Sequence, residues 1–284
     1  MSTLNGRTCV VTGAARGLGL AVAGAFRAAG ARVFLVDRLK GELDVAVATL
    51  GGTASEAAGI VEDLSDPDAP GRIWALVAAA GGATVLVNNA AIQGPIGPCW
   101  QNDWAEWEKT IRVDLLAPVA LCREFVARWR APGFRGKIIN LSGGGAAGPR
   151  GNFTAYAAAK AGLVRFSETL AAETEALGID VNCVAPGPMN GPMLQAIRET
   201  GPGAAGAREF EIATRLTVGT PEVIERAAAL CRYLASAGSD GITGKLLSAV
   251  WDPWESLGQR IKALSEGDVY TLRRVVPKDR GLSW

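Results

Sequence analysis

The chain has 284 residues, 49% of them hydrophobic, and a formal net charge of +1. It is long enough to bury a large core, and its interspersed charges exclude the broad basic field that attracts nucleic acid or an anionic membrane. The sequence contains no histidine, which excludes Ser-His-Asp and Cys-His nucleophiles, His-ligated metals and a histidine general base. Proton transfer must therefore be carried by Tyr, Lys, Asp or Glu.

Seven short apolar runs are spaced along the chain, and Ala-rich stretches of helical length separate them. Most of the runs are continuously apolar, as in strands buried on both faces of a parallel sheet. The expected strands are Thr8–Val11, Arg32–Val36, Gly59–Val61, Thr84–Val87, Lys137–Leu141, Ile179–Val184 and Leu246–Val250. The expected helices are Gly17–Ala29, Gly41–Leu50, Pro67–Ala80, Asp103–Arg130, Ala155–Leu177 and Pro221–Ala235.

This alternation predicts an α/β fold of Rossmann type, a doubly wound parallel sheet with helices on both faces. We expect a single domain over residues 1–284, with a core at about 5–250, a substrate loop at about 186–220 and a C-terminal extension at about 251–284. The Gly/Pro/Ala-rich segment Pro186–Gly206 is the most mobile element that we expect. Ligands of such sheets bind at the carboxyl ends of the strands, so the residues that follow each strand matter most.

Cysteine usage and the first residues indicate a cytoplasmic protein. The six residues before Arg7 form no apolar run and hence no signal peptide. Residues 73–102 carry no formal charge, but glycines, asparagines and prolines interrupt them, so we expect no membrane span. The cysteines have no CxxC spacing and mostly apolar neighbours, and we expect reduced, mostly buried thiols and no metal site at Cys9, Cys99, Cys122, Cys183 and Cys231.

A glycine-rich turn, Thr12–Gly19, follows the first expected strand and opens the first expected helix. Glycines let the backbone turn tightly and approach a pyrophosphate, which the helix N-terminus then meets with its N–H groups. The position of the turn in the first βαβ unit predicts a dinucleotide site. Its expected contacts are Gly13, Ala15, Arg16, Gly17, Leu18 and Gly19.

Charged residues after the second strand bear on the choice of cofactor. Asp37 would accept hydrogen bonds from the adenosine ribose and repel a 2′-phosphate, which favours NAD over NADP. Arg16 and Arg38 argue the other way, because either could reach a phosphate. After the third strand, Asp63 could receive the adenine amino group, and we place Leu64 beside it.

Tyr156 and Lys160 are four residues apart and therefore share one face of a helix. A free tyrosine is a weak base at neutral pH, with a pKa of about 10. A nearby ammonium and an oxidised nicotinamide would lower that pKa. Tyr156 could then take a proton from a substrate hydroxyl while hydride leaves, and Lys160 could also hold the nicotinamide ribose.

Together, the motifs TGxxxGxG (Thr12–Gly19), NNAA (Asn88–Ala91), YxxxK (Tyr156–Lys160) and Pro186-Gly187 resemble those of the short-chain dehydrogenase/reductase family. The resemblance covers about residues 5–250. It implies a seven-stranded sheet, hydride transfer and a homo-oligomer, usually a homotetramer or dimer. It also implies cofactor contacts at Asn89, Ala90, Ala91, Tyr156, Lys160, Pro186 and Gly187.

Three positions depart from the family pattern. The catalytic serine usually precedes the tyrosine by thirteen residues, where this chain has Gly143, so Ser142, Asn152 or Thr154 would have to orient the carbonyl. Because side chains alternate along a strand, Ser142 faces the substrate only if the glycines after it bend the backbone. The family asparagine of the central helix, whose backbone carbonyl holds a water of the proton relay, corresponds to Asp114. The usual threonine after Pro186-Gly187 corresponds to Gly191.

The substrate is a small molecule that the sequence defines only loosely. Arg150 could bind a carboxylate, phosphate or sulfonate, and with Asn152 it suggests a polyhydroxylated substrate such as an anionic sugar. Trp251, Trp254 and Trp284 either wall the pocket or, as we favour, pack at a subunit interface. We therefore expect an NAD-dependent oxidoreductase acting on a secondary alcohol, carbonyl or sugar hemiacetal carbon. The alternatives are an NADPH-dependent carbonyl reductase and a non-catalytic dinucleotide-binding protein.

Overall fold

Seven parallel strands form one sheet in the order β3-β2-β1-β4-β5-β6-β7, which confirms the predicted architecture. The computed structural model describes residues 3–51, 53, 56–216 and 221–284. Residues 217–220, the end of the expected substrate loop, lie outside this description. The strands are β1 (Thr8–Thr12), β2 (Arg32–Asp37), β3 (Ala57–Val61), β4 (Val85–Asn88), β5 (Gly136–Leu141), β6 (Ile179–Ala185) and β7 (Leu246–Ser248).

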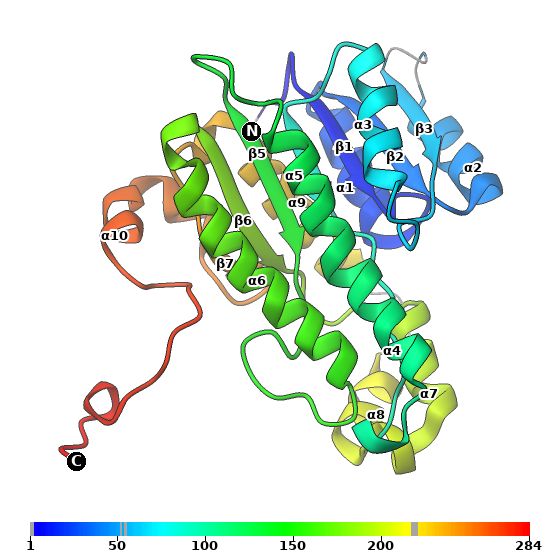
Figure 1. The fold of residues 1–284 in the computed structure, drawn as a ribbon, viewed down its shortest axis with the longest axis vertical. Coiled ribbons are helices and arrows are strands. Elements are labelled where there is room, and N and C mark those ends of the chain that lie inside the picture. Colours follow the sequence, from blue (N-terminus) through cyan, green and yellow to red (C-terminus); the bar gives the residue numbers. More distant parts are fainter. Residues whose placement is uncertain (1–2, 52, 54–55, 217–220) are drawn as a thin grey trace.

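Helices cover both faces of the sheet (Figure 1). They are α1 (Gly17–Ala28), α2 (Lys40–Leu50), α3 (Ala69–Ala79), α4 (Trp104–Ile111), α5 (Ala117–Val126), α6 (Thr154–Thr174), α7 (Pro192–Ala205), α8 (Ala207–Arg215), α9 (Pro221–Ala235) and α10 (Ile261–Glu266). Short 3₁₀ turns occupy Cys99–Gln101, Glu175–Leu177, Ala237–Ser239, Trp254–Gln259 and Pro277–Arg280. None of the helices in the described part of the chain combines the length and apolar character that a membrane crossing needs.

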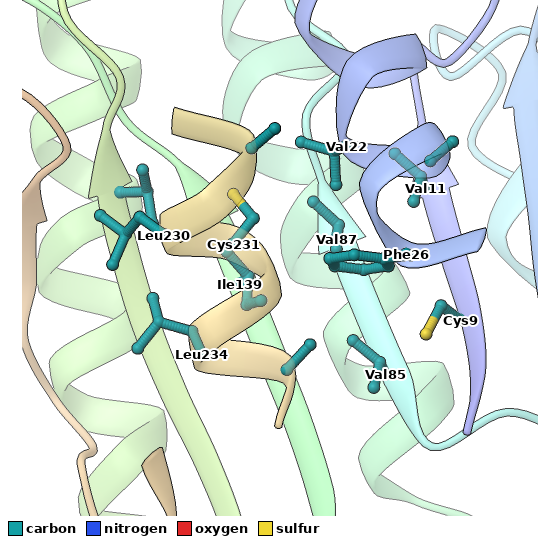
Figure 2. Packing of buried hydrophobic residues seen from close by; sticks show 14 of the residues in the cluster. Cys9, Val11, Val22, Phe26, Val85, Val87, Ile139, Leu230, Cys231 and Leu234 are labelled. Atoms are coloured by element: carbon teal, nitrogen blue, oxygen red, sulfur yellow. The ribbon is translucent and has the colours of Figure 1, made fainter. Parts of the chain in front are cut away.

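Side-chain alternation along the strands divides the core into two layers. Cys9 and Val11 of β1 pack with α1 and α9 on one face, whereas Val10 packs with α3 and α5 on the other. Figure 2 shows the first layer, in which Phe26 of α1 and Cys231 of α9 lie over the sheet. Because both faces are buried, the strands need apolar residues at consecutive positions, and this is why they read as continuous apolar runs.

The helix expected over Asp103–Arg130 is confirmed from Trp104 to Val126, although a π-helical turn interrupts its regular hydrogen bonding. Between α4 and α5, residues Arg112–Leu116 form a π-helical turn in which the N–H of Ala117 bonds to the carbonyl of Arg112, five residues back. Pro118 follows directly and has no N–H to continue the regular helical pattern. The turn contains Asp114, so this irregularity sets the position of one expected site residue.

The segment Pro186–Gly206, which we expected to be the most mobile element, contains α7, and α8 follows it directly. Leu194 and Ile197 of α7 and Ala213 of α8 pack against the fully buried Phe153. Burial of these side chains stabilises helices that glycine and proline disfavour. A kink at Gly201, with φ of 79°, marks the break within α7.

The segment after α10 runs along the open edge of the sheet before it leaves the body of the protein (Figure 1). The N–H of Leu246 in β7 donates to the carbonyl of Tyr270 (2.8 Å), and the N–H of Leu272 donates to Glu168 of α6 (2.6 Å). Residues 270–272 therefore cover part of β7. All five cysteines are free, and four of them are buried while Cys99 is exposed.

Candidate active site

A cavity of about 580 Å³ opens at the carboxyl ends of the strands, where the strand order reverses between β1 and β4. Fifteen of the expected site residues line it: Gly13, Arg16, Gly17, Leu18, Asp37, Arg38, Asp63, Leu64, Asn89, Ala90, Ala91, Ser142, Tyr156, Lys160 and Pro186. Ala15, Gly19, Asp114, Arg150, Asn152 and Gly187 are not among the lining residues. Residues far apart in sequence thus form one continuous wall.

The glycine turn leaves no room for side chains. A Cβ at Gly19 would lie 2.1 Å from the carbonyl oxygen of Gly13, and one at Gly13, whose φ is 64°, would lie 2.8 Å from Cα of Ala90. At the N-terminus of α1 no side chain caps the backbone N–H groups. Uncapped N–H groups beside a turn of this kind suit a pyrophosphate, so the residues present fit a dinucleotide.

Asn89 fixes this turn to the end of β4. Its Nδ2 donates to the carbonyl oxygens of Thr12 (2.9 Å) and Gly13 (3.1 Å), while the Thr12 hydroxyl accepts from the N–H groups of Asn89 and Ala90. The glycine-rich turn and the NNAA motif are therefore joined by hydrogen bonds into one unit.

At the ribose end, Asp37 follows β2 with both carboxylate oxygens engaged by backbone. Oδ2 accepts from the N–H of Ala15 and Oδ1 from that of Leu39, each at 3.1 Å. These bonds hold the carboxylate at the cavity wall.

Both nearby arginines have carboxylate partners, as Arg16 lies 3.3 Å from Glu42 and Arg38 lies 3.7 Å from Asp63. Burial opposes ionisation of Asp63, but hydrogen bonds from Ser65 and the Arg38 charge outweigh it and lower the pKa of that carboxyl.

Tyr156 and Lys160 project from α6 into the cavity, and both are almost fully buried. The Lys160 Nζ donates to the carbonyl of Leu141 (3.1 Å) and lies 5.5 Å from the centroid of the Tyr156 ring. Burial raises the pKa of Tyr156 above its usual value, opposed by Lys160 and Arg150 and reinforced by Asp114. In the unliganded protein the phenol is therefore protonated at neutral pH.

The sequence matches the profile of the short chain dehydrogenase family over residues 7–202. The chain belongs to that family. The match confirms the resemblance inferred from the motifs. Named members that it resembles are dehydrogenases acting on CH–OH groups, and the chain is an NAD(P)-dependent short-chain dehydrogenase of that kind, not the non-catalytic alternative.

Several characterised short-chain dehydrogenases resemble it over most of their length. Cis-4-hydroxycyclohexanecarboxylate dehydrogenase of Sinomonas cyclohexanicum is 34% identical, with 85% of this chain and 94% of the relative aligned. The L-tagatose-forming galactitol 2-dehydrogenase of Cereibacter sphaeroides is also 34% identical, with 86% and 94% aligned.

Solved structures of similar proteins share the fold. One is described as an NAD(P)-dependent gluconate 5-dehydrogenase of Beutenbergia cavernae with bound NADP, at 31% identity, a TM-score of 0.75 and coverage of 87% of this chain and 96% of that one. Another is described as a 2-deoxy-D-gluconate 3-dehydrogenase of Agrobacterium tumefaciens with bound NADP, at 30% identity, a TM-score of 0.73 and coverage of 89% and 98%.

In this short-chain dehydrogenase the position of the family serine is closed to any side chain. A Cβ on Gly143 would lie 2.3 Å from the Tyr156 hydroxyl oxygen. Ser142, one residue earlier, lines the same cavity, and its buried Oγ has no hydrogen-bond partner among the described residues. Thr154 instead accepts from Trp107 (3.2 Å), and neither it nor Asn152 lines the cavity. Of the three candidates, only Ser142 lines the cavity.

Asp114 lies behind Lys160 and not in the cavity wall. Its side chain is fully buried, Oδ1 accepts from the N–H of Ile92 (2.8 Å), and Oδ2 lies 3.6 Å from Nζ of Lys160. Burial raises the pKa of Asp114, against the opposing effects of the Lys160 ammonium and the Ile92 N–H.

Arg150 does not line the cavity and pairs with Glu209 of α8. It donates from Nη2 (2.7 Å) and Nε (3.0 Å) to Glu209, and its guanidinium lies 4.0 Å from the centroid of the Phe153 ring. Asn152 has a φ of 67°, and its backbone carbonyl accepts a hydrogen bond from the N–H of Gly97 (2.9 Å). The charge of Arg150 is thus already compensated, and the substrate roles of both residues stay predictions.

Sequence reasoning missed several residues at the substrate end of the cavity. Gln93 and Gly94 come from the segment after β4, Glu106 and Lys109 from α4, and Met189, Asn190 and Met193 from the segment before and within α7. The only signal in the sequence for any of them was the position of Gln93, two residues after the NNAA motif. None of the three tryptophans singled out lines this cavity: Trp251 and Trp284 are exposed, and Trp254 packs on Tyr233.

Proposed function

We propose that the chain is an NAD-dependent dehydrogenase that oxidises a secondary alcohol of a polyhydroxylated substrate. The proposal includes oxidation at the hemiacetal carbon of a sugar and oxidation of an anionic sugar. The observation that carries the proposal is the cavity that joins Tyr156, Lys160 and Ser142 to the glycine turn and to Asp37. A nicotinamide dinucleotide held by that turn would supply the hydride acceptor. The chain's own residues would then manage the substrate oxygen and its proton.

Three side chains divide that work. Tyr156 Oη accepts the hydroxyl proton, and the Lys160 ammonium stabilises the phenolate that does so. Ser142 Oγ, which lacks a protein partner, donates to the substrate oxygen and fixes its position. In the reverse direction the same groups donate to a carbonyl and return the proton.

NAD is the proposed cofactor because Asp37 stands at the ribose position and both arginines have carboxylate partners. NADP is bound in two of the similar structures, which keeps an NADPH-dependent reductase as the alternative. Replacing Asp37 by Ala should raise the ratio of kcat/KM with NADP to that with NAD at least about tenfold. Asp44→Ala, an exposed carboxylate on α2 outside the cavity, is the matched control. No change in the ratio would contradict the assignment of Asp37.

The substrate class rests on relatives named for galactitol and gluconate. Calorimetric titration with NAD⁺, NADH, NADP⁺ and NADPH should come first, followed by an absorbance screen at the nicotinamide band against polyols, sugar acids and cyclic alcohols. Turnover of a polyol or sugar acid is the expected result. Absence of any dinucleotide binding would overturn the proposal at its base.

We further propose that residues 1–284 act as one cytoplasmic domain within a homodimer or homotetramer. Exposed apolar side chains support an assembly, Trp100, Trp104 and Leu116 among them. Neither nucleic acid nor a membrane is a proposed partner. Light scattering coupled to gel filtration measures the assembly, and a monomer at every concentration would refute it.

A further inference from the structure

The Lys160 ammonium is held between a carbonyl and a carboxylate inside the protein. It donates to the carbonyl of Leu141 (3.1 Å), and Asp114 Oδ2 lies 3.6 Å away. The two side chains are 2% and 0% exposed. Oδ2 has no hydrogen-bond partner among the described residues. The carboxylate therefore faces Lys160 with an unused acceptor.

A hydrogen bond to the backbone does not explain why position 114 carries a carboxylate. Asp114 Oδ1 accepts the N–H of Ile92 (2.8 Å), and the amide oxygen of an asparagine could accept the same bond. What an aspartate adds is a negative charge and a site that a proton can occupy. A buried ion pair is costly to desolvate and is weak grounds for a purely stabilising role.

We propose that Asp114 is the proton acceptor for Lys160, so that the proton released from the substrate is stored on its carboxyl group. The proposal rests on the proposed alcohol oxidation. The substrate hydroxyl proton goes to the Tyr156 phenolate, while the C–H electron pair leaves as hydride to the oxidised nicotinamide. Lys160 gives one proton to Asp114 and takes the proton of Tyr156 in its place. The net products are the carbonyl compound, reduced nicotinamide and the neutral Asp114 acid.

The charges around the pair suit this transfer. Among the described residues, Arg150 on the loop before α6 acts on Tyr156, and Lys160 acts on the Cys183 thiol of β6. Burial raises the pKa of Asp114, which favours the protonated acid that the transfer forms.

The first test is a single turnover followed at two signals, nicotinamide absorbance and a pH indicator. In the wild-type enzyme, hydride transfer should precede proton release to solvent, because the proton stays on Asp114. Asp114→Asn keeps the acceptor for Ile92 and should make the two signals coincide. Glu108→Gln removes an exposed carboxylate from α4 and should keep the lag. Simultaneous signals in the wild-type enzyme would overturn the proposal, whereas absence of nicotinamide reduction would instead count against the proposed function.

A second test needs no cofactor. Infrared titration of the unliganded protein, labelled with ¹³C-aspartate, should show one carboxyl group that loses its proton well above the others. That group should be missing in Asp114→Asn. If all aspartates of the wild-type protein titrate in the ordinary range, the proposal fails even where the variants do not fold.

The pH profile separates this role from a merely structural one. Asp114 raises the pKa of Tyr156, so Asp114→Asn should lower that pKa. Oxidation needs the phenolate, and the acid limb of kcat should therefore move to lower pH by about one unit. An unmoved limb with reduced kcat would indicate a structural role and contradict the proposal.

Discussion

Replacing Gly143 by alanine should damage catalysis through a single added methyl group. The Cβ would lie 2.3 Å from the Tyr156 hydroxyl oxygen and 3.1 Å from Cζ, whereas ordinary contacts begin at 3.4 Å. Gly143 has no positive φ, so its backbone conformation also suits alanine. The clash must therefore be relieved by a movement of the Tyr156 side chain. The hydroxyl oxygen must move by about 1 Å, and a displacement of that size at a reacting atom costs about 100-fold in rate.

The same substitution should leave the protein folded. Crowding a packed site by one methyl group costs about 1–3 kcal/mol, against a typical stability of about 5–15 kcal/mol. We therefore expect kcat to fall about 100-fold, with cofactor affinity nearly unchanged and a small decrease in Tm.

Gly144→Ala is the control for this experiment. Its Cβ would meet only Arg150, at 3.7 Å, so kcat should stay near the wild-type value. If Gly143→Ala keeps kcat within a factor of three, the placement of Tyr156 against this loop is wrong, and so is the argument that Ser142 replaces the family serine.

Other consequences concern ion pairs. Arg150→Ala and Glu209→Gln should each raise the substrate KM, because this ion pair connects α8 to the loop before Tyr156. The double variant should have a KM no higher than either single variant. Additive increases in KM would show that the two residues do not act together. Lys137→Met should lower the free energy of unfolding by about 1–2 kcal/mol, since it leaves the partly exposed Asp180 and Asp240 without the lysine that lies 2.6 and 2.7 Å from them. Urea titration measures this, and unchanged stability would contradict it.

The strands and the dinucleotide turn could be predicted from the sequence because local pattern determines them. Continuous apolar runs located every strand, and glycines between β1 and α1 marked the turn. The helices α7 and α8 could not be predicted in the same way, since their glycines and prolines oppose helix and only burial against Phe153 stabilises them.

The sequence predicted those site residues whose positions follow from their spacing along one helix. It did not predict those whose positions depend on tertiary contacts. The four-residue spacing placed Tyr156 and Lys160 on one face. No local pattern shows that Arg150 pairs with Glu209, 59 positions away, or that a π-helical turn brings Asp114 against Lys160. Strand alternation alone could not decide where Ser142 points, because the backbone after β5 no longer follows the strand.

The segment along β7 has a consequence for solubility. β7 is the last strand of the sheet, and an uncovered edge strand offers unpaired N–H and C=O groups to any other extended chain. Residues 270–272 occupy part of that edge through the bond between Tyr270 and Leu246 and the anchor at Glu168. A version of the protein shortened at Val250 would keep the whole cavity wall but uncover the edge. Because it would also lack the buried Trp254, Leu257 and Leu264, it should lose stability and aggregate by strand pairing.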